Sequence, residues 1–438
     1  MDAARPNIIV IYTDDLGYGD LSCYGSDAIR TPHLDGLAQA GIRFTNWYSN
    51  SPACSPSRAS LLTGRYPQRA GVPNILGGKR GTPGLPASEQ TLATLLKQQG
   101  YATALSGKWH LGVSPECHPL NHGFEHFYGF MAGCVDYFSH IFYWGQAGGV
   151  NPVHDLWRNE EEVWENGRYM TELITSDAVD FIRRSKARPF FSFVSYNAPH
   201  YPMHAPREYM DRFADLPWDR QVMAAMISAV DDGVGQIIRE LKHQGIYDNT
   251  LIFFSSDNGP STEARNWLDG NEDLYYGGSA GIFRGHKGSL FEGGIREPAI
   301  LSWPAGIRGG QVNDEICAMM DIVPTAMEVV GAAMPETGKI DGMSLLSMMR
   351  QGGPGPRDRV YYWSYGDQLA VRQGEWKLVL NGKLDFSRKQ ADTLHLAQLG
   401  EDPGERVNLC TREAALTAQL KADVEQWYGD IEQGLSSA

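Results

Sequence analysis

Apolar runs that alternate with amphipathic segments dominate the first 350 residues of the chain. The run NIIVIY, from Asn7 to Tyr12, is continuously apolar and β-branched, as in a strand covered on both faces. Similar runs are found at 101–105, in PFFSFVSY at 189–196 and in TLIFFSSDNG at 250–259. This alternation predicts an α/β fold with a large, mostly parallel sheet flanked by helices.

The segments between these runs carry helix start and stop signals. TPHLDGLAQAG has Thr31 as the predicted N-cap and Gly41 as the stop. In SEQTLATLLKQQG, Ser88 is the predicted cap of the next helix. Two further amphipathic helices are predicted at 171–185 and 220–243.

The pattern changes after about residue 350. QGGPGPRD is rich in helix and strand breakers and is typical of a link between domains. The chain is therefore predicted to hold a large α/β domain, 1–350, and a small α+β subdomain, 351–438. The subdomain is expected to be an antiparallel sheet with one helix packed on it, from strand-like runs at 360–363, 368–372 and 376–380 and a helix near 412–429.

Composition narrows the range of partners. The 438 residues are 42% hydrophobic, which is enough for a large core. The 38 basic and 52 acidic residues give a formal charge of -14 without a basic stripe, which argues against a nucleic-acid partner. The six cysteines are scattered, so neither a zinc ribbon nor a disulfide framework is indicated.

Targeting and membrane signals are not apparent in the chain as given. It opens MDAARPNIIVIYTDD, which has the features of neither a signal peptide nor a transmembrane span, so no membrane partner is expected. The chain as it stands is expected to be cytoplasmic, and periplasmic or secreted if a leader was removed. Its oligomeric state is not predicted.

Polar clusters follow four of the predicted strands. Because open α/β sheets bind ligands at the carboxyl ends of their strands, these clusters are expected to meet in one site. The clusters are Asp14 and Asp15, GKWHLG with Lys108 and His110, NAPHYP with His200, and SDNG with Asp257 and Asn258.

Three carboxylates and one amide in these clusters are candidate metal ligands. Asp14, Asp15, Asp257 and Asn258 supply hard oxygen atoms, which suit Ca²⁺ or Mg²⁺ better than zinc. The alternative for Asp14 and Asp15 is a turn or cap pair without a ligand.

Cys54 stands in an unusual setting, SPACSPSRASLLTG. Pro56 and the run to Leu62 place it at the start of a helix, where the helix N-terminus favours negative charge. Arg58, four residues later, is expected to face the same way. The alternative interpretation is an ordinary small buried cysteine.

These residues resemble a known family. CSPSRASLLTG is similar to the signature of the type I sulfatases, in which C-x-P-S-R marks a cysteine for conversion to formylglycine. DDLGYGD, GKWHLG, SDNG, GHKGSLFEGGIREP, RQGEWKLVL and DPGERVNL follow in the family's order over nearly the whole chain. The chain is identified as a member of this family, within the alkaline-phosphatase-like superfamily and nearest the arylsulfatase and N-acetylgalactosamine-sulfatase branch.

The resemblance implies a modified nucleophile beside a metal. Cys54 would be converted by a formylglycine-generating maturase, and the hydrated gem-diol would place one oxygen on the metal and one against sulfur. With the modified residue and sulfate completing the shell, Ca²⁺ is favoured for its larger coordination number, with Mg²⁺ as the alternative. The implied ligands are Asp14, Asp15, Cys54, Asp257 and Asn258.

The resemblance also assigns roles to five other side chains. Arg58 would hold the gem-diol, and Lys108 and Lys287 would neutralise sulfate oxygens. His200, with Lys287, would assist departure of the alcohol, and His110 would take a proton so that sulfate is expelled. The alternative is that the lysines are solvated and the histidines structural. In EGGIREP, Glu292 and Arg296 are predicted to form a structural ion pair, and His286 is given no role.

The substrate prediction rests on segment 117–168, which is rich in rings and polar groups. Asp136, His140 and His154 are candidates for bonding sugar hydroxyls, although most rings there could equally be core. GFEHFYGFMAGCVDYFSH resembles sulfatases that act on N-acetylgalactosamine sulfates. The predicted activity is therefore exo-acting removal of sulfate from a sulfated carbohydrate such as a glycosaminoglycan, with aryl sulfates as artificial substrates.

Two other functions stay open at this stage. Phosphonate monoester and phosphodiester hydrolases of the same superfamily share the cysteine signature. If Cys54 stays a thiol, the metal and lysines could hold a sulfate without turnover, which describes a sulfated-glycan binding protein.

Overall fold

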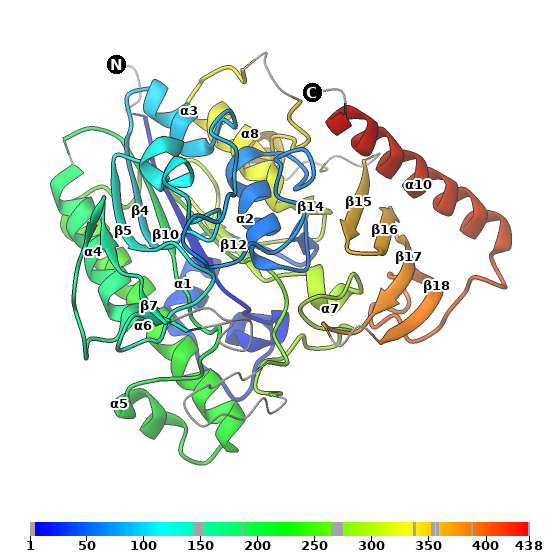
Figure 1. Ribbon diagram of the computed structural model, residues 1–438, viewed down its shortest axis with the longest axis horizontal. Helices are drawn as coiled ribbons and strands as arrows, with labels where there is room; N and C mark the ends of the chain where they lie inside the picture. Colours follow the sequence, from blue (N-terminus) through cyan, green and yellow to red (C-terminus); the bar gives the residue numbers. More distant parts are fainter. Residues whose placement is uncertain are drawn as a thin grey trace.

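A central sheet of ten strands organises the molecule (Figure 1). The computed structural model describes residues 5–143, 152–185, 187–263, 275–335, 339–351, 355, 359–386 and 389–436. The strand order is β13-β2-β12-β11-β1-β10-β4-β5-β8-β9. Strands β11, β1, β10, β4 and β5 are mutually parallel, and antiparallel β12 and β8 join them at either side.

The five mutually parallel strands are buried along their whole length, and all ten strands of the sheet are short. Their bounds are β1 Asn7–Thr13, β2 Ile42–Phe44, β4 Ala102–Lys108, β5 His126–Phe130, β8 Trp157–Arg158, β9 Glu161–Glu162, β10 Phe190–Ser195, β11 Thr250–Ser256, β12 Ala299–Ser302 and β13 Gln311–Asn313. Two small sheets pair β3 Trp47–Tyr48 with β14 Cys317–Ala318, and β6 Ile141–Phe142 with β7 Val153–His154.

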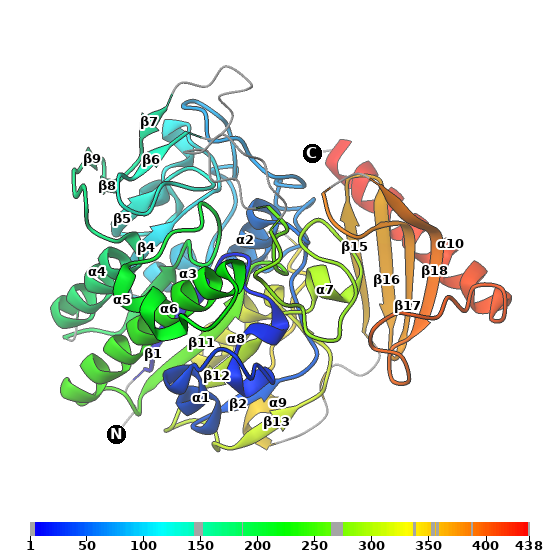
Figure 2. The same ribbon diagram turned by 90° about the horizontal axis from the view of Figure 1, so that it is seen from below.

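Helices cover both faces of the large sheet. Alternation along β1 sends Ile9 and Ile11 into one core and Ile8 and Val10 into the other. The first core is closed by α1 Pro32–Gln39, α4 Met170–Ser185 and α6 Trp218–His243, of which α4 and α6 lie side by side (Figure 2). The second is closed by α2 Cys54–Thr63, α3 Leu92–Gln98, α8 Ile322–Val329 and α9 Leu346–Gln351. Two short helices, α5 Arg207–Met210 and α7 Glu292–Ile295, complete this part of the chain.

A separate antiparallel sheet lies beside this body, in the order β15-β16-β17-β18 (Figures 1 and 2). Its strands are β15 Val360–Tyr365, β16 Gln368–Gln373, β17 Trp376–Lys383 and β18 Gln390–Gln398. One face packs on α10, Ala414–Ser436, through side chains such as Leu378 and Leu420. The other face packs on the main body, where Trp363 and Val379 meet Tyr48 and Phe291.

The predicted fold class is confirmed: a mostly parallel sheet with helices, followed by a smaller antiparallel sheet and helix. The predicted cap at Ser88 is wrong, because the helix begins at Leu92 and the Thr91 side chain accepts the hydrogen bond from the Thr94 amide. Strand β18 was not predicted, and α10 runs further than the predicted helix. The domain boundary at residue 350 stays a prediction.

A buried ion-pair network joins the two parts. The carboxylate of Glu292 accepts hydrogen bonds from Arg296 Nη1 at 3.0 Å and from Lys377 Nζ at 2.8 Å. The predicted pair of Glu292 and Arg296 is therefore present. Burial opposes the charge of Glu292, but Lys377 and Arg296 outweigh it and lower its pKa to about 2. Lys377 also lies 3.3 Å from Glu405, so one buried ammonium serves two carboxylates.

Replacing Lys377 with methionine should destabilise the protein strongly. The substitution keeps the length of the side chain but leaves two buried carboxylates without their shared cation, which costs about 3–5 kcal/mol. Urea denaturation of both proteins measures the change in the free energy of unfolding.

Lys383→Met is the matched control on the same strand. Lys383 pairs with Asp367, whose side chain is 63% exposed, so its loss should cost less than about 1 kcal/mol. Equal effects of the two substitutions would contradict the role given to Lys377.

Candidate active site

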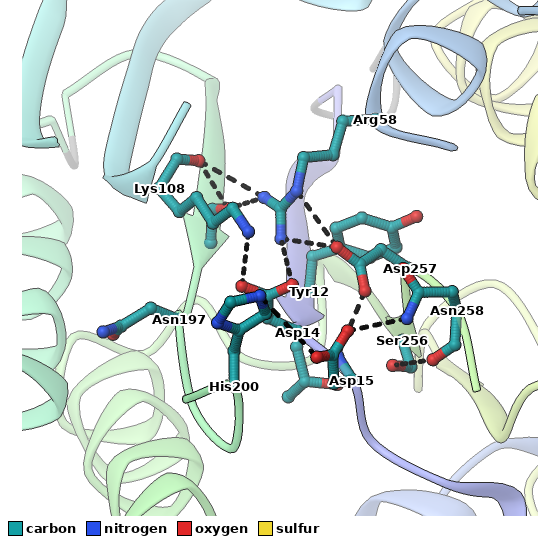
Figure 3. Close-up of polar contacts among 12 residues, drawn as sticks. Tyr12, Asp14, Asp15, Arg58, Lys108, Asn197, His200, Ser256, Asp257 and Asn258 are labelled. Atoms are coloured by element: carbon teal, nitrogen blue, oxygen red, sulfur yellow. Dashed lines mark hydrogen bonds and ion pairs between the residues drawn. The ribbon is translucent and has the colours of Figure 1, made fainter. Parts of the chain in front are cut away.

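Four neighbouring strands deliver polar side chains to one edge of the large sheet. Since β11, β1, β10 and β4 are parallel, their carboxyl ends lie together, as the sequence predicted. Figure 3 shows the side chains converging there. Those that follow or end these strands are Asp14, Asp15, Lys108, His200, Asp257 and Asn258.

The N-terminus of α2 points into this edge, as predicted. Ala53 is the extended N-cap residue, and Cys54 is the first residue of the helix. The thiol is only 1% exposed, and burial raises its pKa well above the ordinary value. An unmodified Cys54 is therefore a neutral thiol and a poor nucleophile at neutral pH.

Arg58 makes several of the polar contacts at this edge of the sheet (Figure 3). Its Nε and Nη2 atoms donate to Asp257 Oδ2 at 3.1 and 2.9 Å, and its Nη1 donates to Ser195 Oγ at 2.6 Å. The guanidinium also lies over the ring of Tyr12, 5.4 Å from its centroid. A fully buried guanidinium with these partners is held in one orientation.

Two lysines face the adjacent aspartates. Lys108 Nζ donates to Asp14 Oδ2 at 2.6 Å, and Lys287 Nζ lies 2.8 Å from Asp15 Oδ1. Burial opposes ionisation of Asp14, but Lys108 and its neighbouring cations lower its pKa below the usual value. Burial and the nearby carboxylates raise the pKa of Asp15 to about 7. The backbone of Asp15 has φ 64°, an uncommon conformation that sets the direction of its side chain.

The oxygen donors in this cluster fit a hard cation. Asp14 Oδ1 and Asn258 Oδ1 are buried and have no hydrogen-bond partner. Ligand atoms of Asp14, Asp15, Cys54 and His200 lie within 4.8 Å of one another. Buried oxygen atoms without partners are costly, and a divalent cation would satisfy them.

Two buried histidines flank the cluster, and their hydrogen bonds fix their tautomers. His110 Nε2 donates to the Leu76 carbonyl at 3.0 Å, which leaves Nδ1 unprotonated and without a partner. His200 Nδ1 donates to the Tyr201 carbonyl at 2.8 Å, which leaves Nε2 unprotonated, 3.7 Å from Asp15 Oδ2. Burial and nearby lysines lower the pKa of both rings well below the ordinary value.

These groups open into a cavity of about 200 Å³. Four predicted catalytic residues line it together with rings and apolar side chains. Phe386 is notable because it comes from the turn after β17, in the C-terminal sheet. The lining is Cys54, Ile75, Leu76, Gly77, Gly78, His110, Gly133, Cys134, Phe142, His200, Tyr201, Glu263, Lys287 and Phe386.

These cavity-lining residues differ in how far the sequence could predict them. Tyr201 follows the predicted His200, and Cys134 and Phe142 fall in the ring-rich segment 117–168. Phe386 had no signal, because only the docking of a distant sheet brings it to the cavity.

The loop that carries Lys287 is clamped from the C-terminal sheet. Gln368, on β16, donates through Nε2 to the Gly288 carbonyl at 2.8 Å. Its Oε1 accepts from the amides of Leu290 at 3.3 Å and Lys383 at 3.0 Å. Gln368 is buried, so these bonds fix the loop without competition from water. Sequence reasoning missed it.

The three predicted sugar-binding residues are not brought together at this cavity. Asp136 Oδ1 accepts from the amide and hydroxyl of Ser139 at 2.6 and 2.8 Å, which stabilises a turn. His140 Nε2 bonds the Arg168 carbonyl at 3.1 Å. His154 lines a second cavity, described below. Sugar binding by these three residues stays a prediction.

Comparisons with known proteins indicate the same family as the sequence motifs. The family described as Sulfatase matches residues 6–332, and the family described as N-sulphoglucosamine sulphohydrolase, C-terminal, matches residues 278–429. Within the part of the chain that the structure describes, no helix has the length and apolar character of a membrane span.

Individual relatives cover nearly the whole chain. N-acetylgalactosamine-6-sulfatase of Mus musculus is 36% identical over 92% of this chain and 82% of its own length. Arylsulfatase A of Bos taurus is 35% identical over 93% of this chain and 84% of its own length. The crystal structure of Ps i-CgsB in complex with k-i-k-neocarrahexaose matches with a TM-score of 0.85 and 32% identity, over 97% of this chain and 92% of that one. The chain therefore belongs to the sulfatase family and is a sulfuric ester hydrolase.

Proposed function

We propose that this sulfatase removes sulfate from a sulfated carbohydrate, with a formylglycine made from Cys54 as its nucleophile. The observation that carries the proposal is the position of Cys54. It opens α2 within a C-x-P-S-R sequence and its sulfur lies in one cluster with Asp14 and Asp15. A neutral, buried thiol is poorly suited to attack an ester, whereas a precursor of a modified residue needs no thiolate.

The metal proposed for the cluster is Ca²⁺. Asp14, Asp15, Asp257 and Asn258 would hold it, with residue 54 close enough to join them. Such a cation supplies charge that stabilises the sulfate oxygens and the attacking oxygen. Oxygen-only donors favour a hard ion, as the sequence predicted.

The lysines and Arg58 are proposed to organise charge around the sulfur. Lys108 and Lys287 each contact an aspartate and lie beside residue 54, whose ionisation both would favour. They would neutralise the sulfate oxygens as charge develops there. Arg58 would contact residue 54 from the buried side of the site. It also donates a hydrogen bond that orients Asp257.

The two histidines, which both line the cavity, are proposed to transfer protons in separate steps. Each presents an unprotonated nitrogen, Nδ1 in His110 and Nε2 in His200. A neutral imidazole nitrogen can accept a proton from a nearby hydroxyl, so His110 suits the base that releases sulfate. Departure of the alcohol needs a donated proton, so His200, with Lys287 in the same lining, would assist that step in its protonated form.

A carbohydrate is the proposed source of the sulfate. The relatives act, by name, on N-acetylgalactosamine 6-sulfate or aryl sulfates, and Ps i-CgsB binds a carrageenan hexasaccharide. The cavity of about 200 Å³ has room for one sugar ring, and Tyr201, Phe142 and Phe386 offer faces against which such a ring packs. A cavity of this size fits a terminal sugar, from which the enzyme would remove sulfate in an exo-acting manner. A formylglycine-generating maturase is the partner that the chemistry requires.

Peptide mass spectrometry after expression with a formylglycine-generating enzyme should show Cys54 converted. The peptide should be lighter by about 18 Da, the difference between a thiol and an aldehyde. Cys54→Ala should abolish hydrolysis of an aryl sulfate and leave the unfolding midpoint close to wild type, whereas Cys410→Ala, outside the cavity, should keep full activity.

An unmodified and active Cys54, or an active Cys54→Ala protein, would sink the proposed nucleophile. A converted protein that hydrolyses phenylphosphonate esters faster than aryl and sugar sulfates would favour the phosphonate hydrolase alternative. A protein that binds sulfated glycans with an intact thiol and no turnover would favour the binding-protein alternative.

Chelator-treated protein should become more stable when Ca²⁺ is added back. A ligand bound only by the folded state, at about 100 times its Kd, adds about 2.7 kcal/mol to the free energy of unfolding. Thermal unfolding with and without Ca²⁺ measures the effect. Asp15→Asn should remove most of it, because it deletes one of the carboxylates that would hold the ion.

Asp232→Asn is the matched control for this experiment. Asp232 belongs to a second grouping of His33, Asp231 and Asp232, in which Asp231 caps α1 by accepting from the Leu34 amide at 2.8 Å. This variant should keep the full response to Ca²⁺. An unfolding midpoint that ignores millimolar Ca²⁺ in the wild type would contradict the metal assignment.

Gln368→Leu should slow turnover through Lys287. The substitution removes two hydrogen bonds to the Lys287 loop and one to the Lys383 amide, and displacement of a catalytic group by about 1 Å costs up to about 100-fold in rate. We expect kcat for an aryl sulfate to fall by this amount and KM to change less. Gln373→Leu, at the exposed end of the same strand, should leave kcat unchanged, and an equal fall in both variants would refute the positioning role.

A further inference from the structure

A second cavity, of about 420 Å³, lies next to the catalytic cavity. The two share Gly78 in their linings. The second cavity lies between the 78–81 and 113–118 loops and the strands β7 and β8, far from the C-terminal sheet (Figure 2). Nothing in the mechanism proposed above uses it.

Gly78, the residue that the two linings share, carries no side chain at the boundary between the cavities. A Cβ atom built on Gly78 would lie 2.5 Å from the Phe142 ring, so only glycine fits there. Gly77 precedes it, and both glycines line the catalytic cavity. The Phe142 ring therefore packs directly on Gly78 at the boundary, and a sugar chain that reaches both cavities would pass beside this ring.

Trp157 and Arg80 are two groups of the second cavity that can contact a ligand. Trp157 is half-buried, with its ring at the cavity wall, and the Arg80 guanidinium lies 5.8 Å from the ring centroid. The Arg80 side chain is 59% exposed and makes one long ion pair, 3.9 Å, with Glu162. An aromatic face beside an exposed donor is a common arrangement for binding a sugar ring and its hydroxyls.

Two other polar side chains of the lining are occupied within the protein, whereas His154 Nε2 is buried without a hydrogen-bond partner. Asp155 accepts from Trp157 Nε1 at 2.7 Å and from the amides of Met131 and Ala132. His118 Nε2 bonds the Asn159 carbonyl at 3.0 Å. These bonds fix the Trp157 ring and make the wall rigid, so that binding would need little reordering.

The charges in the lining of the second cavity favour an uncharged sugar. One guanidinium, on Arg80, faces the carboxylates of Asp155 and Glu160, so the cavity has no net attraction for a second sulfate or a uronate. This contrasts with the catalytic cavity, where Lys287 lies in the lining and Lys108 just behind it. Val113, Met131 and the glycines supply apolar surface for the remaining contacts.

We propose that the second cavity binds an uncharged sugar linked to the sulfated one, so that the substrate is an oligosaccharide rather than a single sugar. The inference rests on the proposed function, because it places a second unit of the same substrate beside the catalytic cavity. It gives Trp157 and Arg80 roles in substrate selection that are separate from the reaction itself.

The test compares three probes with the matured enzyme: N-acetylgalactosamine 6-sulfate alone, the same sugar linked to galactose, and the same sugar linked to glucuronate. We expect the highest kcat/KM for the galactose disaccharide. Arg80→Ala and Trp157→Leu should each lower that value by about tenfold, the worth of one good aromatic or hydrogen-bond contact. For the monosaccharide, kcat/KM of both variants should stay within about twofold of the wild-type value.

Arg158→Ala is the matched control for both substitutions. Arg158 neighbours Trp157 on β8, but its guanidinium lies over Tyr128 and 3.8 Å from Asp177, away from the cavity. This variant should preserve the preference for the galactose disaccharide. Unfolding midpoints of all variants separate loss of binding from loss of structure.

The possible results separate the two proposals. Equal hydrolysis of monosaccharide and disaccharides by the wild type, or equal losses on all probes in Arg80→Ala and Trp157→Leu, would overturn the second sugar site and leave the sulfatase function intact. Preference for the glucuronate disaccharide would overturn the neutral specificity on which the inference is built. Hydrolysis of an aryl sulfate but of none of the sugars would overturn the carbohydrate function and the inference with it.

Discussion

The structure depends on a balance of buried charge at one end of the large sheet. Three carboxylates, Asp14, Asp15 and Asp257, face three cations, Arg58, Lys108 and Lys287. With every group ionised the formal sum is zero, yet Asp14 Oδ1 and Asn258 Oδ1 keep unused lone pairs. A divalent cation would satisfy these atoms and give the site a net positive charge. An acidic protein can thus attract a sulfate ester at this one place.

The parallel sheet brings these charges together at little cost in conformational freedom. Asp14 and Asp257, two of the proposed ligands, directly follow fully buried strands whose ladder hydrogen bonds already fix the backbone. The only unusual backbone among the oxygen donors is that of Asp15, which has a positive φ. Arg58 reaches the same place from α2, every residue of which is buried. The rigid frame holds like charges close together, which flexible loops would not do.

Local sequence signals predicted most of the proposed metal ligands but few of the residues that line the cavity. Asp14 and Asp257 were predictable because they follow apolar runs, and the start of α2 because Pro56 follows Cys54. Phe386 and Gln368 were not, since Gln368 bonds a carbonyl 80 residues away and Phe386 reaches the cavity only through the docking of its sheet. The cap at Ser88 failed because Thr91, three residues later, competes for the same helix start. Packing between distant elements decides such cases.

The two sides of the cavity therefore have different structural origins. The large sheet alone sets the oxygen ligands and Lys108, whereas the position of Lys287 depends on hydrogen bonds from Gln368 in the C-terminal sheet. That sheet is in turn tied to the main body by Glu292 and Lys377, whose buried charges tolerate only one relative placement. Lys287, which is proposed to act at the leaving group, is thus positioned by ion pairs and hydrogen bonds outside the substrate cavity. Changes in this sheet can alter the substrate cavity while the oxygen ligands stay where they are.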